Sequence, residues 1–273
     1  MPDPLTLARG VTRSAHTFDD QAPRYDARVG LPEPVATAVA RAIVERANAG
    51  ADDLVVELGA GTGEIGVHLD RLPIQYRGLD ASLAMLDLFR AKAAPASPLL
   101  VAADCDRTWP LPDSSATVVF ASRVIHLLQP DHVVRETMRV CRPAGRLILG
   151  RVVRDRDGIA ERLRRRRLEL LTAAGISARQ GEAGTRRVIE GVVALGGESL
   201  GRQIVAEWSS ETTPAAVIAD WESLARMGSV AVDAETRGRI LDALRDWAQA
   251  EFGDLDRPQE FAAHYAIDII RVP

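Results

Sequence analysis

A glycine-rich stretch directly after an apolar run constrains the fold of this chain more than any other feature. Residues 55–66 read VVELGAGTGEIG, so a β-branched run leads into four glycines and then into helical periodicity. Glycine lets the backbone turn sharply and lets a ligand approach it without a Cβ in the way. In open α/β sheets, ligands bind at the carboxyl ends of the strands. The stretch predicts a strand, a ligand-binding turn and a helix.

Apolar runs alternate with helical periodicity from about residue 53 to about residue 155. They are DLVVEL, QYRGLD, PLLVAAD, ATVVFAS and RLILGRVV, with helical segments such as SLAMLDLFRAKA and DHVVRETMRVC between them. Short β-branched runs separated by helices indicate βαβ units and a parallel sheet covered on both faces. Together with two further strands predicted beyond residue 151, this pattern leads us to expect an α/β, Rossmann-like, doubly wound and mostly parallel seven-stranded sheet.

The alternation ends after residue 151, and a helical insertion near the C-terminus interrupts the last strands. The pattern predicts helices at 158–174, 184–195, 213–228 and 233–253, and strands at SLGRQIVAEW and HYAIDIIRV. Thr213 followed by Pro214 is a typical helix start, and Gly253 a typical stop. The two helices inserted between the last two strands are expected to roof a pocket.

Composition places the chain among ordinary globular proteins. Of its 273 residues 47% are hydrophobic and 26% charged, and no apolar run approaches the ~18 residues of a membrane span. The N-terminus lacks the apolar region of a signal peptide, so we expect a cytoplasmic protein. The net charge of −4 and the aromatic content of 4% argue against a nucleic-acid partner. Cys105 and Cys141 form no metal or redox spacing, so we expect no metal site and place Cys141 in an amphipathic helix.

Three carboxylates fall at the ends of the first three strands. Glu57 is the penultimate residue of its apolar strand, Asp80 follows the second strand, and Asp104 ends the third. A carboxylate at the position of Asp80 can accept both hydroxyl hydrogens of a ribose. Asp104 can accept the amino hydrogens of adenine, and Cys105 can offer its backbone N–H to a ring nitrogen. The acids predict a site for a ligand that carries an adenosyl group.

The glycine stretch permits two interpretations that differ in the cofactor. Read from Gly61 it satisfies the dinucleotide pattern G-x-G-x-x-G, and read from Glu57 it is E-x-G-x-G-x-G. A carboxylate beside a dinucleotide pyrophosphate would repel it, whereas a ligand with an ammonium and a sulfonium group would be attracted. This argument favours S-adenosylmethionine over NAD.

Taken together, these motifs resemble the class I S-adenosylmethionine-dependent methyltransferases, in particular the branch with quinone-biosynthesis C-methyltransferases and many small-molecule enzymes. The resemblance covers residues 18 to about 150. Its motifs are FDDQAPRYD, VVELGAGTG, YRGLDASLAML, ADCDRTWPLPDSSATVVFASRVIHLL and MRVCRPAGRLILG. Two positions depart from the family pattern: Thr117 replaces an acid before the fourth strand's apolar run, and Ala144 replaces the first glycine of Pro-Gly-Gly.

The resemblance implies a role for each matching residue. The cofactor site would comprise Tyr25, Glu57, Gly59, Ala60, Gly61, Gly63, Asp80, Ala81, Asp104, Cys105, Ala121 and Ser122. The glycines would line the methionine and ribose portion, Glu57 would face the amino end, and Tyr25 would close over the cofactor. The backbone near Ala121 and Ser122 would meet the methionine part.

His126, just past the fourth strand, is the candidate general base, because histidine changes protonation near neutral pH. The alternative is a residue at a helix start that packs beside the cofactor.

Two features beyond residue 150 have competing interpretations. The run Arg164–Arg167 suggests RNA or a membrane surface, although charge runs are usually a solvated helix face. Four large apolar residues of the inserted helices are expected mainly in the core, as aromatic residues on amphipathic helices usually are. One or two of them are expected to line an apolar substrate pocket. They are Trp221, Met227, Trp247 and Phe252.

The implied organisation is one structural domain in three parts. Residues 1–50 would cover the cofactor site, 51–155 would form the methyltransferase core, and 156–273 would complete the sheet, with 213–253 as the substrate cover. The expected function is methyl transfer from S-adenosylmethionine to a small-molecule acceptor by in-line displacement. An NAD-dependent oxidoreductase and a non-catalytic S-adenosylmethionine-binding protein remain alternatives.

Overall fold

The computed structural model describes Asp19, Ala22, Asp26 and residues 30–176, 181–222 and 232–273. The strands are β1 (Leu54–Leu58), β2 (Gln75–Asp80), β3 (Leu99–Ala102), β4 (Ala116–Ser122), β5 (Cys141–Arg154), β6 (Glu198–Thr212) and β7 (Gln259–Arg271). The helices are α2 (Glu33–Ala47), α3 (Gly66–Leu69), α4 (Leu83–Ala93), the 3₁₀ helix η2 (Ile125–Leu127), α5 (Pro130–Val140), α6 (Ile159–Ala173), α7 (Gly181–Ala194), α8 (Pro214–Glu222) and α9 (Ala234–Phe252).

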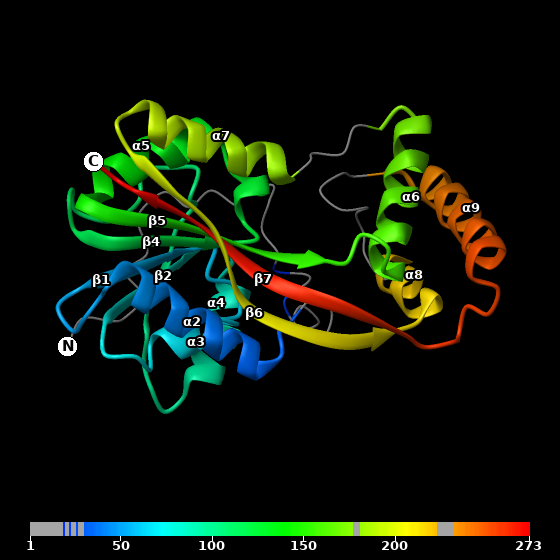
Figure 1. Cartoon of the computed structure of the whole chain (residues 1–273), viewed down its shortest axis with the longest axis horizontal. Coiled ribbons are helices and arrows are strands. Elements are labelled where there is room, and N and C mark those ends of the chain that lie inside the picture. The colour runs from blue at the N-terminus through cyan, green and yellow to red at the C-terminus, as the bar shows by residue number, and fades with distance from the viewer. Residues whose placement is uncertain (1–18, 20–21, 23–25, 27–29, 177–180, 223–231) are drawn as a thin grey trace. The chain divides into compact units, whose positions relative to one another are not determined.

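All seven strands join one sheet in the order β3-β2-β1-β4-β5-β7-β6. Strands β1 to β5 pair in parallel, whereas β7 runs against its neighbours (Figure 1). The order reverses between β1 and β4, where Leu58 lies opposite Ala121. The expected mostly parallel, doubly wound sheet is confirmed, and its switch point lies at the ends of β1 and β4.

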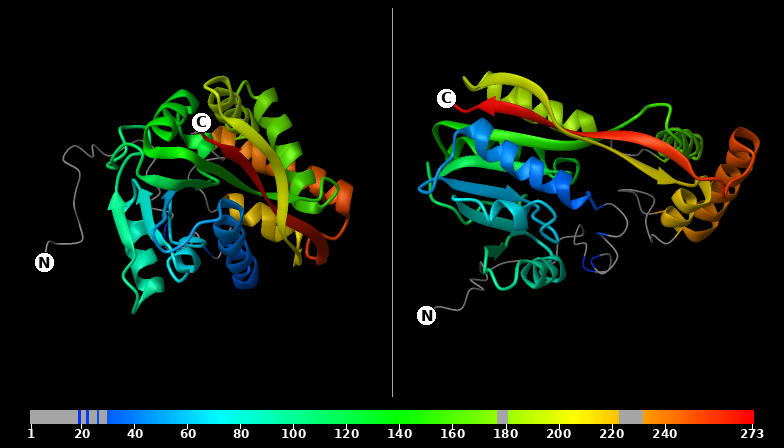
Figure 2. Two further views of the ribbon diagram at one scale, coloured as in Figure 1. Left: turned by 60° about the vertical axis from the view of Figure 1, so that its left-hand side comes forward. Right: turned by 60° about the horizontal axis from the view of Figure 1, so that its bottom comes forward.

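Helices cover both faces of the sheet. The views in Figures 1 and 2 place α5 and α7 on one face and α2, α3 and α4 on the other. The central strands are therefore buried on both sides: β4 has no exposed residue, and β1 is exposed only in part at Leu54. This double cover explains why these strands read as continuous apolar runs rather than alternating ones.

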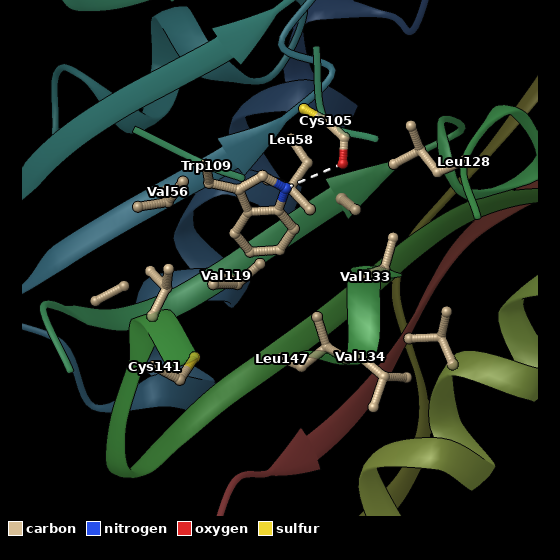
Figure 3. Close-up of a cluster of buried hydrophobic side chains, with 14 of the residues drawn as sticks. Val56, Leu58, Cys105, Trp109, Val119, Leu128, Val133, Val134, Cys141 and Leu147 are labelled. Atoms are coloured by element: carbon tan, nitrogen blue, oxygen red, sulfur yellow. Dashed lines mark hydrogen bonds between the residues drawn. The ribbon is translucent and has the colours of Figure 1, made fainter. Parts of the chain in front are cut away.

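The core under α5 centres on Trp109, which is 1% exposed. Its indole Nε1–H donates to the carbonyl of Cys105 at 3.0 Å (Figure 3). The same cluster contains Cys141, which begins β5 and does not lie in the helix expected from the sequence. Helix α5 ends one residue earlier, at Val140. The expectation of a buried Cys141 thiol is nonetheless met, and burial raises the pKa of this thiol to about 12.

The chain divides into two compact units. The first comprises Met1–Arg151, Gly181–Ala206 and Tyr265–Pro273, and the second Val152–Gln180 and Glu207–His264. The boundaries fall inside β5, β6 and β7. The organisation into one domain with a substrate cover stays a prediction.

The second unit has an apolar core of its own, built from α6, α8 and α9 around Leu163, Ile218 and Leu244. Asp233 begins α9 as expected, because its carboxylate accepts a hydrogen bond from the Thr236 N–H at 2.8 Å. Within the described residues, no helix combines the length and apolar character that a bilayer crossing requires.

The arginine run lies on α6 and packs inside this second unit. The Arg167 guanidinium stands 4.1 Å from the ring centre of Trp221, and Arg162 stands 4.8 Å from that of Phe252. Burial lowers the pKa of Arg167 to about 10, whereas Arg164 pairs with Glu161 on the helix surface. The interpretation as a solvated face therefore holds for only part of the run. Met227, one of the pocket candidates, lies outside the described residues.

Candidate functional site

The strand register brings most of the candidate cofactor residues to one edge of the sheet. Leu58 pairs with Leu79 on one side and with Ala121 on the other, and Asp80 pairs with Ala102. The segments that directly follow these strands therefore meet at the carboxyl edge. They carry Gly59, Ala60, Gly61, Gly63, Ala81, Asp104, Cys105 and His126, and Ser122 is the last residue of β4.

Three glycines of the turn after β1 adopt backbone conformations that other residues avoid. The φ angles of Gly59, Gly61 and Gly63 are 63°, 55° and 80°. A Cβ on Gly59 would lie 2.6 Å from Val124 Cγ2, and one on Gly63 would lie 2.4 Å from Phe89 Cδ2. At Gly61 the nearest atom is 3.9 Å away. The turn therefore packs at both ends and leaves backbone accessible in its middle.

Asp80 ties this turn to the end of β2. One carboxylate oxygen accepts from the Gly61 N–H and the other from the Ser82 N–H, both at 2.8 Å. Burial raises the pKa of Asp80, and these backbone hydrogen bonds oppose that effect. Each oxygen keeps a further lone pair with which to accept a hydroxyl hydrogen.

Glu57 lies buried beneath the turn, with 3% of its surface exposed. The hydroxyl of Tyr76, on β2, donates to Glu57 Oε2 at 2.5 Å. Burial raises the pKa of Glu57 to about 8, although the hydrogen bond from Tyr76 and the charge of Arg123 lower it. The carboxyl is therefore mostly protonated at neutral pH when no cation lies beside it.

Asp104 and Cys105 form the start of the loop after β3. Asp104 Oδ1 accepts from the Asp106 N–H at 3.0 Å, and Oδ2 lies 3.7 Å from Arg107 Nε. The Cys105 carbonyl is fixed by Trp109. Burial raises the pKa of the Cys105 thiol to about 12, so the thiol stays protonated near pH 7. The loop is anchored at its base, and Asp104 Oδ2, whose ion pair with Arg107 is 3.7 Å long, keeps a lone pair for a further donor.

At the end of β4, the Ser122 hydroxyl lies 2.6 Å from the hydroxyl of Tyr265, on β7. His126 belongs to η2 just beyond, and burial lowers its pKa. A neutral imidazole near pH 7 can accept a proton, which suits a general base. The alternative role, a residue that packs beside the cofactor, is equally consistent with this burial.

Sequence reasoning missed the ion pair between Glu64 and Arg123, which joins the glycine turn to the segment after β4. Glu64 Oε1 also accepts from the Leu31 N–H at 2.5 Å. Arg123 has a φ of 56°, unusual for a residue other than glycine. The sequence did contain a signal for this pair, because Glu64 is a charged residue within the glycine-rich stretch 55–66. Arg123 lies within one of the family motifs and Glu64 directly follows another, but the resemblance implied no role for either.

The N-terminal segment contacts the same edge through two carboxylates that the sequence reasoning did not single out. Asp19 accepts from the Ser82 hydroxyl and Asp26 from the Thr62 hydroxyl, each at 2.5 Å. Asp26 also pairs with Lys92, which is the single lysine of the chain. Tyr25, the residue expected to close over the cofactor, lies outside the described residues.

Comparison with known proteins supports the assignment that the motifs suggest. Residues 56–149 match a family model described as a methyltransferase domain. This match covers part of the chain, so residues 56–149 are similar to methyltransferase domains. The matched residues include the acid before the glycine turn, the ends of β1 to β4 and most of β5.

Proteins of two mycobacteria are similar to part of this chain in sequence. Uncharacterized methyltransferases of Mycobacterium bovis and Mycobacterium tuberculosis are each 35% identical to the chain over 103 residues. The match covers 38% of this chain and 40% of each relative, so it leaves most of both proteins uncompared.

Solved structures share the fold of this chain at low sequence identity. A Bacillus halodurans protein described as a methyltransferase aligns with a TM-score of 0.56 at 16% identity, covering 86% of this chain and 98% of its own. The [4+2]-cyclase SpnF aligns with a TM-score of 0.52 at 18% identity, covering 87% and 80%. These similarities concern the fold alone.

Proposed function

We propose that this chain transfers a methyl group from S-adenosylmethionine to a small-molecule acceptor by in-line displacement. The observation that carries the proposal is that Glu57, Asp80 and Asp104 lie at or just after the ends of β1, β2 and β3, beside a glycine turn with accessible backbone at Gly61. Bound S-adenosylmethionine would supply a methyl group on a positively charged sulfur.

The residues present fit such a cofactor by charge and by space. Asp80 would accept the ribose hydroxyls and Asp104 the adenine amino group, while the backbone of residues 59–63 would lie along the ligand. Glu57 would face the ammonium end, where a negative charge stabilises a cation. Ala121 and Ser122 would offer backbone groups to the methionine part.

The protein's own contribution to the reaction would be positioning. Holding two reactants at reacting distance can supply most of the rate enhancement in a displacement of this kind. His126 would remove a proton from the acceptor where the attacking atom carries one, because burial favours its neutral form. The second unit, with its aromatic residues, is the proposed source of acceptor specificity.

A thermal-shift comparison tests the cofactor. S-adenosylhomocysteine is expected to raise the melting temperature, and NADH to leave it unchanged, because a bound ligand stabilises the folded state by mass action. Asp80→Asn should reduce the shift. Asp87→Asn is the matched control, since Asp87 is an exposed residue of α4 paired with Arg90. A shift with NADH alone would favour the oxidoreductase.

Turnover distinguishes an enzyme from a cofactor-binding protein. Release of S-adenosylhomocysteine should appear with at least one member of a panel of small-molecule acceptors and should depend on Asp80. Binding without release across a broad panel that includes phenols, amines, thiols and carbon acids would favour the non-catalytic alternative.

A further inference from the structure

We propose that the Tyr76–Glu57 pair couples cofactor binding to the release of one proton, with Tyr76 as the residue that positions the Glu57 carboxyl. In the ligand-free protein the carboxyl keeps its proton; when the ligand's ammonium group arrives beside it, the proton leaves to solvent and a carboxylate–ammonium pair remains. This inference rests on the proposed function.

Two glycines, Gly66 and Gly78, leave the space through which the Tyr76 side chain reaches Glu57. Tyr76 and Gly78 lie on the same face of β2, and Gly78 is paired with Glu57 of the neighbouring strand. A Cβ on Gly78 would lie 2.9 Å from the Tyr76 hydroxyl, and one on Gly66 only 2.4 Å from it. Any larger residue at these positions would obstruct the phenol, so both glycines keep open the path to Glu57.

Gly66 also completes the literal dinucleotide pattern of the sequence. In the fold it begins α3 and faces Tyr76 and Phe89 rather than a strand-end ligand. The glycine that matched a pyrophosphate motif therefore has a different purpose, which is to make room for a buried hydrogen bond.

The charges around Glu57 favour its protonated form in the empty site. From the elements packed against it, the titratable groups that face it are Tyr76 and Asp80 of β2, Glu64 after the glycine turn, and Arg123 after β4. Tyr265 of β7 is also close enough to interact electrostatically with Glu57, Glu64 and Arg123. The single cation of this group, Arg123, forms an ion pair with Glu64.

A cationic ligand reverses this balance. Burial and the neighbouring carboxylates hold the pKa of Glu57 at about 8, and an ammonium group nearby would lower it. By linkage, whatever lowers the proton affinity of Glu57 must bind more tightly when the proton is absent. The ligand's affinity is therefore expected to rise as the pH increases towards 8.

Isothermal titration calorimetry with S-adenosylhomocysteine tests the coupling. Titrations of the full chain in phosphate and in Tris, which differ in ionisation enthalpy, give the number of protons exchanged at each pH. Nearly one proton should be released per ligand at pH 7, falling to about a quarter at pH 8.5 for a group of this pKa. The association constant should rise by up to about tenfold per pH unit between pH 6 and 8.

Three variants assign the proton. Glu57→Gln should abolish the release and flatten the pH dependence of affinity. Tyr76→Phe removes a hydrogen bond that favours the carboxylate, so it should move the release profile to higher pH, with more release than wild type at pH 8.5. Tyr265→Phe removes another buried hydroxyl, which contacts Ser122 instead of Glu57, and should leave the profile as in wild type.

The outcomes separate this inference from the proposed function. If S-adenosylhomocysteine binds with no proton released, or if Glu57→Gln releases as much as wild type, the coupling is wrong and the cofactor proposal stands. If the ligand gives neither heat nor thermal shift, both fail. A profile that does not move in Tyr76→Phe would reduce Tyr76 to a packing residue and overturn its positioning role.

Discussion

Glu57 sits among apolar side chains of β1, and burial raises the pKa of its carboxyl to about 8. In the unfolded chain that pKa returns to about 4.3. Between the two values the folded protein holds a proton that the unfolded chain has lost, so the free energy of unfolding falls as the pH rises, by up to about 1.4 kcal/mol per unit. This contribution is complete below the unfolded value and is lost as the pH passes through 8.

The Glu57→Gln variant should remove this dependence. Urea denaturation of the ligand-free protein at pH 6, 7 and 8 should show the variant gaining stability relative to wild type as the pH increases. Glu190→Gln, on the exposed surface of α7, is the control and should track wild type. A variant that loses stability in parallel with wild type would mean that Glu57 is ionised in the folded protein.

Ala144 shows a residue in a conformation that suits glycine. It replaces the first glycine of the family's Pro-Gly-Gly, and its φ is 62°. A left-handed backbone costs a residue with a Cβ about 1–2 kcal/mol, partly offset by the greater freedom of glycine in the unfolded chain. Ala144→Gly should therefore stabilise the protein by up to about 1 kcal/mol in urea denaturation. A destabilised variant would show that this turn is unstrained.

At the scale of the element, helix α3 depends on the absence of a side chain at its first residue. A Cβ at Gly66 would press on the Tyr76 hydroxyl and on Phe89 Cζ, at 2.4 and 2.5 Å. Gly66→Ala should thus cost about 1–3 kcal/mol of folding stability by overpacking. Gly238→Ala in α9 is the matched helical control, because no atom lies within 4 Å of its Cβ position.

The control is expected to move in the opposite direction. Alanine is a better helix former than glycine by about 0.5–1 kcal/mol, so Gly238→Ala should raise the free energy of unfolding. Equal effects of the two substitutions would remove the proposed role of Gly66.

The central strands could be predicted from this sequence because a strand that is buried on both faces, such as β4, consists of a continuous run of apolar residues. The acids at strand ends were predictable because a parallel sheet gathers its carboxyl ends at one edge. The hydrogen bond between Tyr76 and Glu57 could not be predicted. It depends on the register of β1 and β2 and on the space left by Gly66 and Gly78, and the sequence alone reveals neither. Cys141 was placed in a helix because the apolar period of α5 continues past its true end at Val140.

At the scale of the whole molecule, the second unit carries a core of its own, with Leu244 fully buried in it. Leu244→Ala should cost about 2–5 kcal/mol through lost burial and a cavity. If the two units have separate cores in solution, hydrogen exchange should accelerate in α6, α8 and α9 while α2 to α5 keep wild-type protection.

A uniform increase in exchange across the chain would mean that both units unfold together, as the sequence-based expectation of one domain requires. The aromatic residues of this unit could not be assigned from sequence, because Arg167 of a run that looked solvent-facing stacks on Trp221, and Arg162, just before that run, stacks on Phe252.

Lys92 is the single lysine of the sequence, and it pairs with Asp26 of the N-terminal segment. An acylating reagent or a fluorophore ester that reacts with primary amines therefore has one side-chain target in this chain. That target stands where the N-terminal segment meets α4, so a dye attached there would report on this junction in the natural sequence, without an engineered cysteine.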